Sequence, residues 1–482
     1  MRRNTARVAC AQLVARPLEE ARKALDEIVA AIAAAARRHA DIVVLPECSY
    51  PGYVLLGTHP YSRRLGGSDR IPTAAQALAR VSAAAARHGI AVAVGIADHA
   101  PDASLRNEAV FIDKTGRVAG RYAKNYLWSF DSRWFARGDS IPVFDSDFGP
   151  IGMMICADGR VPEIARELVR LGAWLILDPT AWVGYGASAE SMQNPQVDYM
   201  LAVRAFENGV WIAAADKCGS EYGAVHYVGR SRIVAPDGTT VAEAGALEPE
   251  IIIAEVRRSR HAASWRRAVV SRSSDGATVS LTPSAAPPTG RRPGRSRRHT
   301  AAGAVWLGVY QAPRGRGSSG IRASEKVDRL PDTFERRLLQ TLEAQGVDTI
   351  VRTDSAPAQL RRALAAAPTL RAYGITGDGM LGGAAARSAA QDGADLLLWL
   401  QPPQRMPVLG IARARALENR IYVLVCARAR PDVCACLIDP DGSLVACALL
   451  DRPSAFIARV DPTTARRKQV VPGTDVYAPV HA

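Results

Sequence analysis

The sequence predicts an α/β fold, and three observations lead to this prediction. Short apolar runs alternate with amphipathic, Ala-rich stretches through the first 256 residues, which is the order that builds sheets covered by helices. One of the runs, Asp41–Leu45, is apolar enough for a strand buried on both faces. The same order of signals returns in residues 303–482. The 482 residues suffice for two or three domains.

The expected elements follow one another regularly along the first 256 residues. A strand over 8–13 leads into an amphipathic helix over 18–39, and the buried strand over 41–45 precedes a helix over 73–88. Further strands are expected over 90–97, 108–113, 151–155, 173–177, 210–215, 231–234 and 251–256, and further helices over 162–171 and 200–208.

The second half of the chain is interpreted as a shortened copy of the first. Five short segments return in the same order; for example, Ile155–Arg160 (Ile-Cys-Ala-Asp-Gly-Arg) returns as Ile375–Met380 (Ile-Thr-Gly-Asp-Gly-Met). The stretch between residues 48 and 148 has only a brief counterpart. We therefore expect three regions, namely a first domain over 1–256, an Arg/Ser/Pro-rich linker over 257–302 and a degenerate second domain over 303–482.

The net charge of +14 is concentrated in the expected linker. Between Arg257 and Arg298 the chain carries eleven arginines and one acidic residue, Asp275, so this segment alone contributes +10. Because the segment is rich in Ser, Pro and Gly and nearly free of aromatic residues, we interpret it as a solvated linker. An electrostatic contact of these arginines with RNA or a membrane surface is the alternative.

The sequence predicts neither a membrane span nor a secretory signal nor a disulfide framework. Its apolar runs are far shorter than the roughly 20 residues of a spanning helix, and the N-terminus leads directly into the first expected strand. The eight cysteines are scattered, which is typical of a reducing compartment. Cys434 and Cys436 alternate on a strand without metal-ligand spacing. We expect a cytoplasmic protein with free thiols.

Glu47, Lys124 and Cys156 each occupy a place that suits chemistry. Glu47 follows the buried strand directly, at the edge where α/β sheets place their sites, and Lys124 is one of only six lysines. Cys156 stands between a strand and a helix that opens at Pro162, where backbone N–H groups and the helix N-terminus favour a thiolate. Taken singly, a loop carboxylate, a surface lysine and a core thiol are equally ordinary explanations.

Together these three residues are the parts of an amide-cleaving site. A thiol nucleophile needs a base for its proton, a positive donor for the developing oxyanion and an acid for the departing amine. None of the eight histidines offers an evident base. A Cys/Glu/Lys chemistry therefore fits the sequence better than a Cys/His chemistry.

Four segments of the first domain carry recognisable motifs. Cys156–Glu163 reads Cys-Ala-Asp-Gly-Arg-Val-Pro-Glu, and Asp178–Trp182 reads Asp-Pro-Thr-Ala-Trp. With Leu45–Glu47 and Tyr122–Lys124, these motifs resemble the carbon–nitrogen hydrolase (nitrilase) superfamily over residues 5 to 256, except that Asp178 replaces an asparagine. The resemblance implies an αββα sandwich and a Glu47–Lys124–Cys156 triad, with no metal or organic cofactor.

Asp131 is a departure from that family's pattern, which often has a glutamate seven residues after the lysine. Aspartate is one methylene shorter, so we expect its carboxylate to reach Lys124 only with a local shift of the chain. Several aromatic residues are candidates for the walls of the substrate site, although ordinary packing explains each of them equally well. The candidate substrate-binding residues are Tyr53, Trp128, Trp134 and Trp182, with the backbone N–H of Ala157 as an oxyanion donor.

The resemblance implies cleavage of a small amide, carbamoyl compound or nitrile through an acyl-thioester on Cys156. In this scheme Glu47 deprotonates the thiol and later activates water, and Lys124 stabilises the tetrahedral centre. Two other functions stay open: a non-catalytic binding or regulatory protein, and an acyl- or amidotransferase. The expected partner is a small molecule rather than a membrane or nucleic acid, and a homo-oligomer or an internal pseudo-dimer is expected.

The second unit carries a rival motif. Gly377–Gly382 fits the Gly-x-Gly-x-x-Gly pattern of dinucleotide binding. Alignment of the two copies places this segment on the elbow that holds Cys156, with Thr376 opposite the nucleophile and Asp354 opposite Glu47. The lysine loop has no counterpart. We therefore expect a catalytically inactive repeat rather than a nucleotide site.

Overall fold

In the computed structural model the chain divides into two units, residues 1–270 together with 471–482, and residues 271–470. None of the helices in the described part of the chain is both long and apolar enough to cross a membrane. The structure describes residues 3–55, 71–258, 279–281, 304–312, 332–381, 383–404, 406–450, 452–471 and 474–475.

The larger sheet of the first unit has eight strands. They are β1 (Thr5–Val14), β2 (Ile42–Val44), β3 (Ala91–His99), β4 (Leu105–Ile112), β5 (Val118–Ala123), β10 (Lys217–Glu221), β11 (Val225–Val228) and β14 (Glu250–Arg257). Their order is β11-β10-β1-β2-β3-β4-β5, and β14 pairs antiparallel with β1. β1, β2 and β3 run parallel, so the segment after β2, which holds Glu47, leaves the carboxyl edge of the sheet.

The smaller sheet of the first unit has six strands in the order β13-β12-β9-β8-β7-β6. β7, β8 and β9 are parallel, which places the residues after β7 and at the end of β8 at one edge. The strands are β6 (Val143–Phe144), β7 (Ile151–Met153), β8 (Leu175–Pro179), β9 (Trp211–Ala215), β12 (Arg232–Val234) and β13 (Thr240–Glu243).

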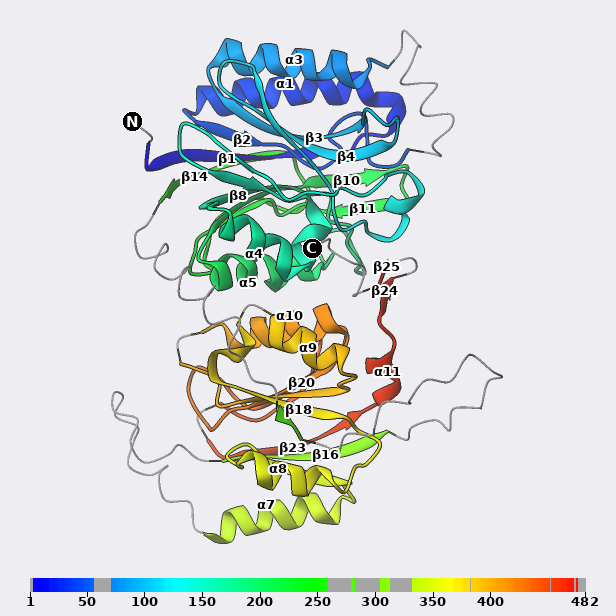
Figure 1. The fold of residues 1–482 in the computed structure, drawn as a ribbon, viewed down its shortest axis with the longest axis vertical. Coiled ribbons are helices and arrows are strands. Elements are labelled where there is room, and N and C mark those ends of the chain that lie inside the picture. Colours follow the sequence, from blue (N-terminus) through cyan, green and yellow to red (C-terminus); the bar gives the residue numbers. More distant parts are fainter. Residues whose placement is uncertain are drawn as a thin grey trace. The chain divides into compact units, whose positions relative to one another are not determined.

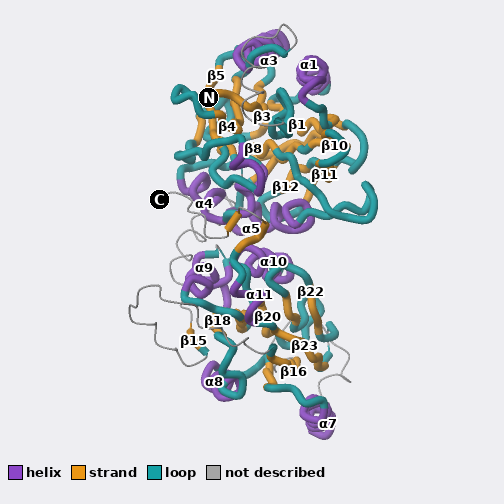
Figure 2. The backbone as a smooth tube through the Cα atoms, turned by 90° about the vertical axis from the view of Figure 1, so that its right-hand side faces the viewer, coloured by secondary structure: helices purple, strands orange, loops and turns teal. Residues whose placement is uncertain are grey.

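Helices cover the outer face of each sheet in the first unit. Figures 1 and 2 show α1 (Ala21–Arg37) and α3 (Ala74–His88) against the larger sheet, and α4 (Pro162–Arg170) and α5 (Leu201–Asn208) against the smaller one. Alternation along β1 explains the layers: Val8 and Cys10 join the core between the sheets, whereas Ala9 and Ala11 join the core under α1 and α3. This confirms the mixed α/β fold expected for the N-terminal region.

The helix boundaries follow from local chemistry. The Thr73 side chain accepts a hydrogen bond from the Gln76 N–H at 3.2 Å, and the Gln76 side chain accepts one from the Thr73 N–H at 2.8 Å, which closes the first turn of α3. The helix ends at Gly89, whose φ of 64° suits a residue without a side chain. In α1, Leu25, Ile28 and Ile32 share one buried face.

The second unit contains a six-stranded sheet in the order β15-β18-β19-β20-β21-β22 and a three-stranded sheet in the order β17-β16-β23. Its strands are β15 (Val279–Ser280), β16 (Val305–Gln311), β17 (Thr349–Arg352), β18 (Ala372–Thr376), β19 (Leu396–Leu400), β20 (Tyr422–Cys426), β21 (Cys436–Ile438), β22 (Leu444–Cys447) and β23 (Ser454–Val460). Its helices are α7 (Asp332–Ala344), α8 (Pro357–Leu364), α9 (Ala384–Gln391), α10 (Val408–Asn419) and α11 (Pro462–Arg466). β24 (Gln469–Val471) and β25 (Thr474–Asp475) form a separate two-stranded sheet.

Part of the expected linker is a strand. Val279–Ser280 pair antiparallel with β18, and Leu281 is 1% exposed. The interpretation of 257–302 as solvated throughout is therefore wrong at these residues, because a short apolar alternation completes the edge of a sheet. Most of the arginines that carry the charge of this segment lie outside the described residues.

The placement of Thr376 opposite Cys156 is wrong by one residue. The left-handed backbone conformation after the strand falls at Cys156 in the first unit (φ 48°) and at Gly377 in the second (φ 53°). An arginine donates to the carbonyl three residues further on in each case, that of Gly159 and that of Met380, both at 2.9 Å. Matching Asp158-Gly159 with Asp378-Gly379 places Thr376 opposite Cys156. Matching the two left-handed residues places Gly377 there instead.

Candidate active site

Cys156 lies at the elbow between β7 and α4. The strand ends at Met153, and a 3₁₀ turn over Cys156–Arg160 leads to Pro162, the first residue of the helix. The φ of 48° at Cys156 is a left-handed conformation that a residue with a side chain adopts at a cost. The thiol residue is only 7% exposed. The fold therefore holds this cysteine in a strained, sheltered turn.

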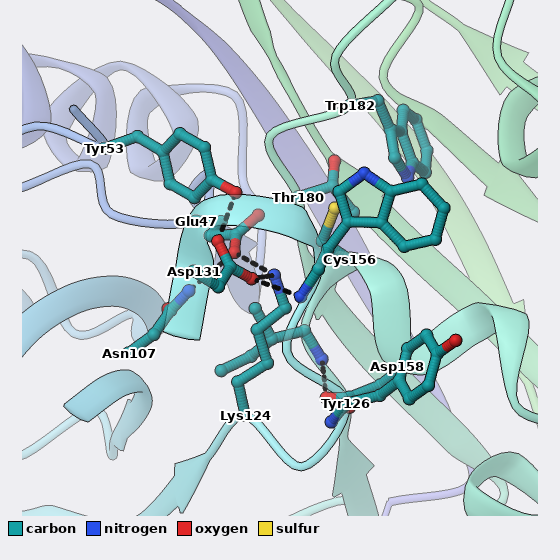
Figure 3. Close-up of polar contacts among 12 residues, drawn as sticks. Glu47, Tyr53, Asn107, Lys124, Tyr126, Asp131, Cys156, Asp158, Thr180 and Trp182 are labelled. Carbon is teal, nitrogen blue, oxygen red and sulfur yellow. Dashed lines mark hydrogen bonds and ion pairs between the residues drawn. The ribbon is translucent and has the colours of Figure 1, made fainter. Parts of the chain in front are cut away.

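Asp158 fixes the shape of this elbow. Its carboxylate accepts hydrogen bonds from the N–H of Ile155 at 2.9 Å, from the N–H of Tyr126 at 2.7 Å and from the Tyr122 hydroxyl at 2.8 Å. Burial raises the pKa of Asp158 to about 6, although these three donors lower it. The bonds to Tyr126 and Tyr122 tie the elbow to the segment that carries Lys124, and Figure 3 shows Asp158 beside Tyr126.

Lys124 bridges two carboxylates inside the unit. Its Nζ lies 2.7 Å from Glu47 Oε1 and 2.7 Å from Asp131 Oδ2, and all three side chains are fully buried. Figure 3 shows the three meeting beside Cys156. The Glu47 N–H donates to the Thr180 carbonyl at 3.1 Å, which ties the Glu47 loop to the end of β8. The structure therefore brings together Glu47, Lys124, Asp131 and Cys156.

Asp131 reaches Lys124 despite its short side chain. It lies in a 3₁₀ turn over Ser129–Arg133, where the φ of Ser129 is 49°. Its Oδ2 also accepts the Trp128 N–H at 2.9 Å, and its Oδ1 accepts the Tyr53 hydroxyl at 2.5 Å. The tight turn brings the shorter carboxylate to Lys124, and Tyr53 occupies its second oxygen.

The charges of the site shift its pKa values in opposing directions. Burial raises the pKa of Glu47, and Lys124 opposes this rise. Burial alone would lower the pKa of Lys124, but Asp131 and Glu47 raise it well above its ordinary value. Burial and then Glu47 raise the pKa of the Cys156 thiol well above its usual value, while Lys124 and the Ala181 N–H lower it. Proton transfer from Cys156 to Glu47 would keep the total charge of the cluster constant.

Glu47 has one committed oxygen and one free oxygen. Oε1 accepts hydrogen bonds from Lys124 Nζ at 2.7 Å and Asn107 Nδ2 at 2.6 Å. Oε2 is buried and has no hydrogen-bond partner in the described structure. A buried acceptor without a partner is costly, and at this place it is an oxygen ready to receive a proton.

The predicted wall residues differ in exposure. Trp128 and Trp134 are half-buried. Tyr53 is 2% exposed and packs edge-to-face against Trp134, with ring centres 6.4 Å apart. Trp182 and Ala157 are buried. Tyr53 supports Asp131, and a contact of any of these residues with substrate stays a prediction.

Sequence reasoning missed several residues of the site. Asn107 of β4 donates to Glu47, and the Gln196 side-chain amide donates to the Cys156 carbonyl. The available signal for Asn107 was a polar residue within an otherwise buried strand, which identifies no role by itself. Arg160 stacks over the Trp128 ring at 4.1 Å and donates to Gln196 Oε1 at 3.2 Å. Within the described residues no acidic side chain pairs with its guanidinium.

No group of three or more His, Cys, Asp or Glu side chains within the described ranges is arranged to hold a metal ion. Cys434 and Cys436, both free thiols in the described part of the chain, belong to no such group, and Cys436 is buried.

The comparisons with known proteins identify the family of this chain. The family model for carbon–nitrogen hydrolases matches residues 7–267, more than half of the chain. The chain therefore belongs to the carbon–nitrogen hydrolase family, an enzyme family of the amidase and nitrilase type.

The similarity extends over most of the length of several relatives. A Pseudomonas protegens protein described as "Hydrolase in pqqF 5'region" is 35% identical over 216 residues, which are 44% of this chain and 70% of that protein. A deaminated glutathione amidase of Synechocystis is 30% identical over 273 residues, 52% of this chain and 92% of its own. The crystal structure of an amidase from Nesterenkonia sp. shares 29% identity with a TM-score of 0.46, covering 56% of this chain and 97% of its own.

Proposed function

We propose that the first unit hydrolyses a carbon–nitrogen bond of a small molecule through an acyl-thioester on Cys156. The observation that carries the proposal is the Glu47 carboxylate, of which one oxygen is held by Lys124 and Asn107 while the other is buried and unpartnered. Such a carboxylate is oriented and still able to accept a proton, as a general base must be.

The proposed reaction has two halves. The Cys156 sulfur attacks the amide carbon while its proton passes to Glu47, and Glu47 then returns the proton to the departing amine. The resulting thioester is attacked by water, whose proton Glu47 accepts and passes to the thiolate as the acid leaves. Glu47 is therefore in the same protonation state before and after a cycle.

Lys124 is suited to stabilise the oxyanion. An ammonium group has three N–H donors, and two of them are taken by Glu47 and Asp131. The third has no acceptor among the described residues, so it is available to a substrate oxygen in the proposed reaction. With the Ala157 N–H it would form the pair of donors on which acyl transfer depends.

The proposed substrate is a small amide, carbamoyl compound or nitrile, as the names of the relatives from Pyrococcus abyssi (nitrilase) and Synechocystis (deaminated glutathione amidase) also suggest. Arg160 narrows this choice. Its guanidinium has no acidic partner within the described residues, and it interacts electrostatically with Cys156. A carboxylate on the substrate would provide the missing partner.

We also propose that the second unit is a catalytically inactive repeat. β16 pairs antiparallel with β23 and parallel with β17, as β1 does with β14 and β2. The order β18-β19-β20-β21-β22 parallels β7-β8-β9-β12-β13. Gly377 stands where the nucleophile would be, and Asp354 stands in the place of Glu47. The pairing of β15 with β18 extends the second domain beyond the expected 303–482, so that it includes part of the expected linker.

The proposed function is tested by ammonia release from a panel of amides, N-carbamoyl compounds and nitriles, each with and without a carboxylate. Glu47→Gln should lose at least about 10² in rate, the lower end of what a positioned acid–base contributes. Arg160→Gln should raise KM only for the carboxylate-bearing members. Release from no member by the wild-type protein would contradict the proposal.

Glu221→Gln is the matched control for Glu47→Gln. Glu221 is likewise buried and paired with a buried lysine, Lys217, at 2.8 Å. Its oxygens, however, are all engaged, because they also accept the N–H groups of Tyr53 and Val54. We therefore expect a much smaller loss of rate in this variant, and equal losses would show that Glu47 has only a structural role.

A further inference from the structure

Asp178 lies directly behind the proposed nucleophile. It belongs to the carboxyl end of β8 and is completely buried, and its Oδ1 accepts the Cys156 N–H at 2.9 Å. An asparagine at this place would offer the same carbonyl acceptor without a charge. The aspartate therefore makes this position of the elbow ionisable, which an asparagine would not be.

The second oxygen of Asp178 shows which form the site favours. Oδ2 is buried and has no hydrogen-bond partner among the described residues. The carboxyl thus meets a single donor and no cation in contact. A buried carboxylate with so little compensation is far more costly than a neutral carboxyl group, so the surroundings favour a proton on Oδ2.

The charged and titratable groups that face Asp178 favour the neutral form as well. Burial raises the pKa of Asp178 well above its usual range, Asp158 and Glu47 raise it further, and the Cys156 N–H and Lys124 lower it. Burial raises the pKa of the Cys10 thiol on β1, and the charge of Asp178 raises it further. Lys124, the cation that lowers the pKa of Asp178, is already shared by two other carboxylates.

We propose that Asp178 is a proton-switched positioning residue: neutral, it anchors the elbow as a carboxamide would, and ionised, it opposes formation of the Cys156 thiolate. This inference rests on the proposed role of Cys156. When the thiolate forms, negative charge moves from Glu47 to Cys156, toward the group whose N–H Asp178 holds. A negative Asp178 repels that charge and raises the pKa of the thiol.

The sign of the pH dependence follows from this arrangement. Because the pKa of Asp178 is raised, the carboxyl keeps its proton through the pH range in which an ordinary aspartate has lost it. At lower pH the neutral Asp178 does not oppose formation of the Cys156 thiolate. As the pH rises through the pKa of Asp178, the carboxylate forms and opposes it. Asp178→Asn removes the ionisable group and keeps a carbonyl oxygen that can accept the Cys156 N–H.

The test compares the rate of Cys156 alkylation by iodoacetamide in the wild-type protein and in Asp178→Asn, from mildly acidic to strongly alkaline pH. Peptide mass spectrometry assigns the modification to Cys156 rather than to the neighbouring Cys48. We expect equal rates at the acidic end and, at the alkaline end, a rate about tenfold higher in the variant, which corresponds to one unit of thiol pKa. Ammonia release over the same range should diverge in the same way.

Asp216→Asn is the control. Asp216 is also completely buried, accepts the Trp182 N–H at 2.8 Å through Oδ1 and has an unpartnered Oδ2. Burial raises its pKa well above the usual range too, but it makes no contact with the Cys156 N–H. The alkylation profile of this variant should keep the shape of the wild-type profile.

Each other outcome overturns the proposal. Profiles that coincide at every pH would show that the Asp178 charge does not reach the thiol. A variant that is faster by the same factor at every pH would show that Asp178 is ionised throughout. Failure of Asp178→Asn to fold would show that a carboxamide is no substitute for the native group. Because alkylation needs no turnover, a protein that releases no ammonia would refute the proposed function while this test could still succeed.

Discussion

After β7 the chain turns at Cys156 with a φ of 48°, and after β18 it turns at Gly377 with a φ of 53°. A buried arginine from a later helix holds each turn: Arg204 forms an ion pair with Glu207, and Arg415 forms one with Glu418. The backbone of the elbow and its support are thus the same in the two units. The left-handed turn by itself is a structural feature, which needs no nucleophile.

The side chains around the two elbows differ. Asp178 accepts the N–H of Cys156 in the first unit, whereas in the second the Trp399 indole donates to the Gly377 carbonyl at 2.9 Å. Trp399 is fully buried and fills the space behind its elbow. The first unit thus holds a strained cysteine and a buried polar cluster at a cost in stability, whereas the second has a glycine and a buried aromatic residue at the comparable places.

Cys156→Gly should have the largest effect, because it gives the first elbow the residue of the second. Turnover should be abolished, since the covalent route is lost. The free energy of unfolding should change by no more than about 1 kcal/mol, because relief of the left-handed strain offsets the lost side-chain burial. Ammonia release and thermal unfolding measure the two effects, and residual turnover above a few per cent would contradict the assignment of the nucleophile.

Lys124→Ala should lower the rate by about 10²–10³, the effect of removing one oxyanion donor. Lys217→Ala is its control, because it breaks a buried Lys–Glu pair of similar geometry. Both variants should lose stability, since each leaves a buried carboxylate unpaired. Only Lys124→Ala should show the large decrease in kcat, and a change in KM alone would make Lys124 a binding residue.

Tyr53→Phe should have a smaller effect on turnover. It removes the hydroxyl that donates to Asp131 and keeps the packing against Trp134. A decrease of about three- to tenfold in kcat is expected, in line with the loss of one hydrogen bond. An unchanged kcat with normal folding would mean that turnover does not depend on the hydrogen bond from the Tyr53 hydroxyl to Asp131.

Gly377→Cys is the reverse substitution, because it gives the elbow of the second unit the cysteine of the first. A Cβ atom added at Gly377 meets no other atom within 4 Å, so we expect the backbone conformation to be the main obstacle to the substitution. We expect a loss of about 1–2 kcal/mol in the free energy of unfolding from the left-handed strain, measured in urea. Combined with Cys156→Ala, the substitution should restore no ammonia release, and any restored activity would show that the second unit retains a functional site.

Asp354→Asn with Thr376→Ser should have the smallest effect. These residues stand near the positions of the base and the nucleophile in the second unit, where Asp354 lies within 4.0 Å of Arg428. Ammonia release should be unchanged. A loss of more than tenfold in a folded double variant would assign chemistry to the second unit.

The sequence was informative where one short segment determines the structure. The strand and helix periods located α1, α3 and the parallel strands, and three short motifs located Glu47, Lys124 and Cys156. It was uninformative where distant segments must meet. Asn107 comes to Glu47 only through the pairing of β4 with β3.

Three further features escaped prediction for physical reasons. β15 is a two-residue strand that pairs with the edge of β18, a contact that no local period reveals. The reach of Asp131 depends on the turn over Ser129–Arg133 rather than on side-chain length. The one-residue error at Gly377 arose because residue identity was matched where backbone conformation decides.

The central claim is that Cys156 carries an acyl group during turnover. The most direct test is intact-mass measurement of the wild-type protein mixed with a slowly hydrolysed amide, followed by peptide mapping. We expect a mass increase equal to the acyl group, located on Cys156, and none in Cys156→Ala. Turnover without any adduct in the wild-type protein, together with unchanged turnover in Cys156→Ala, would contradict it.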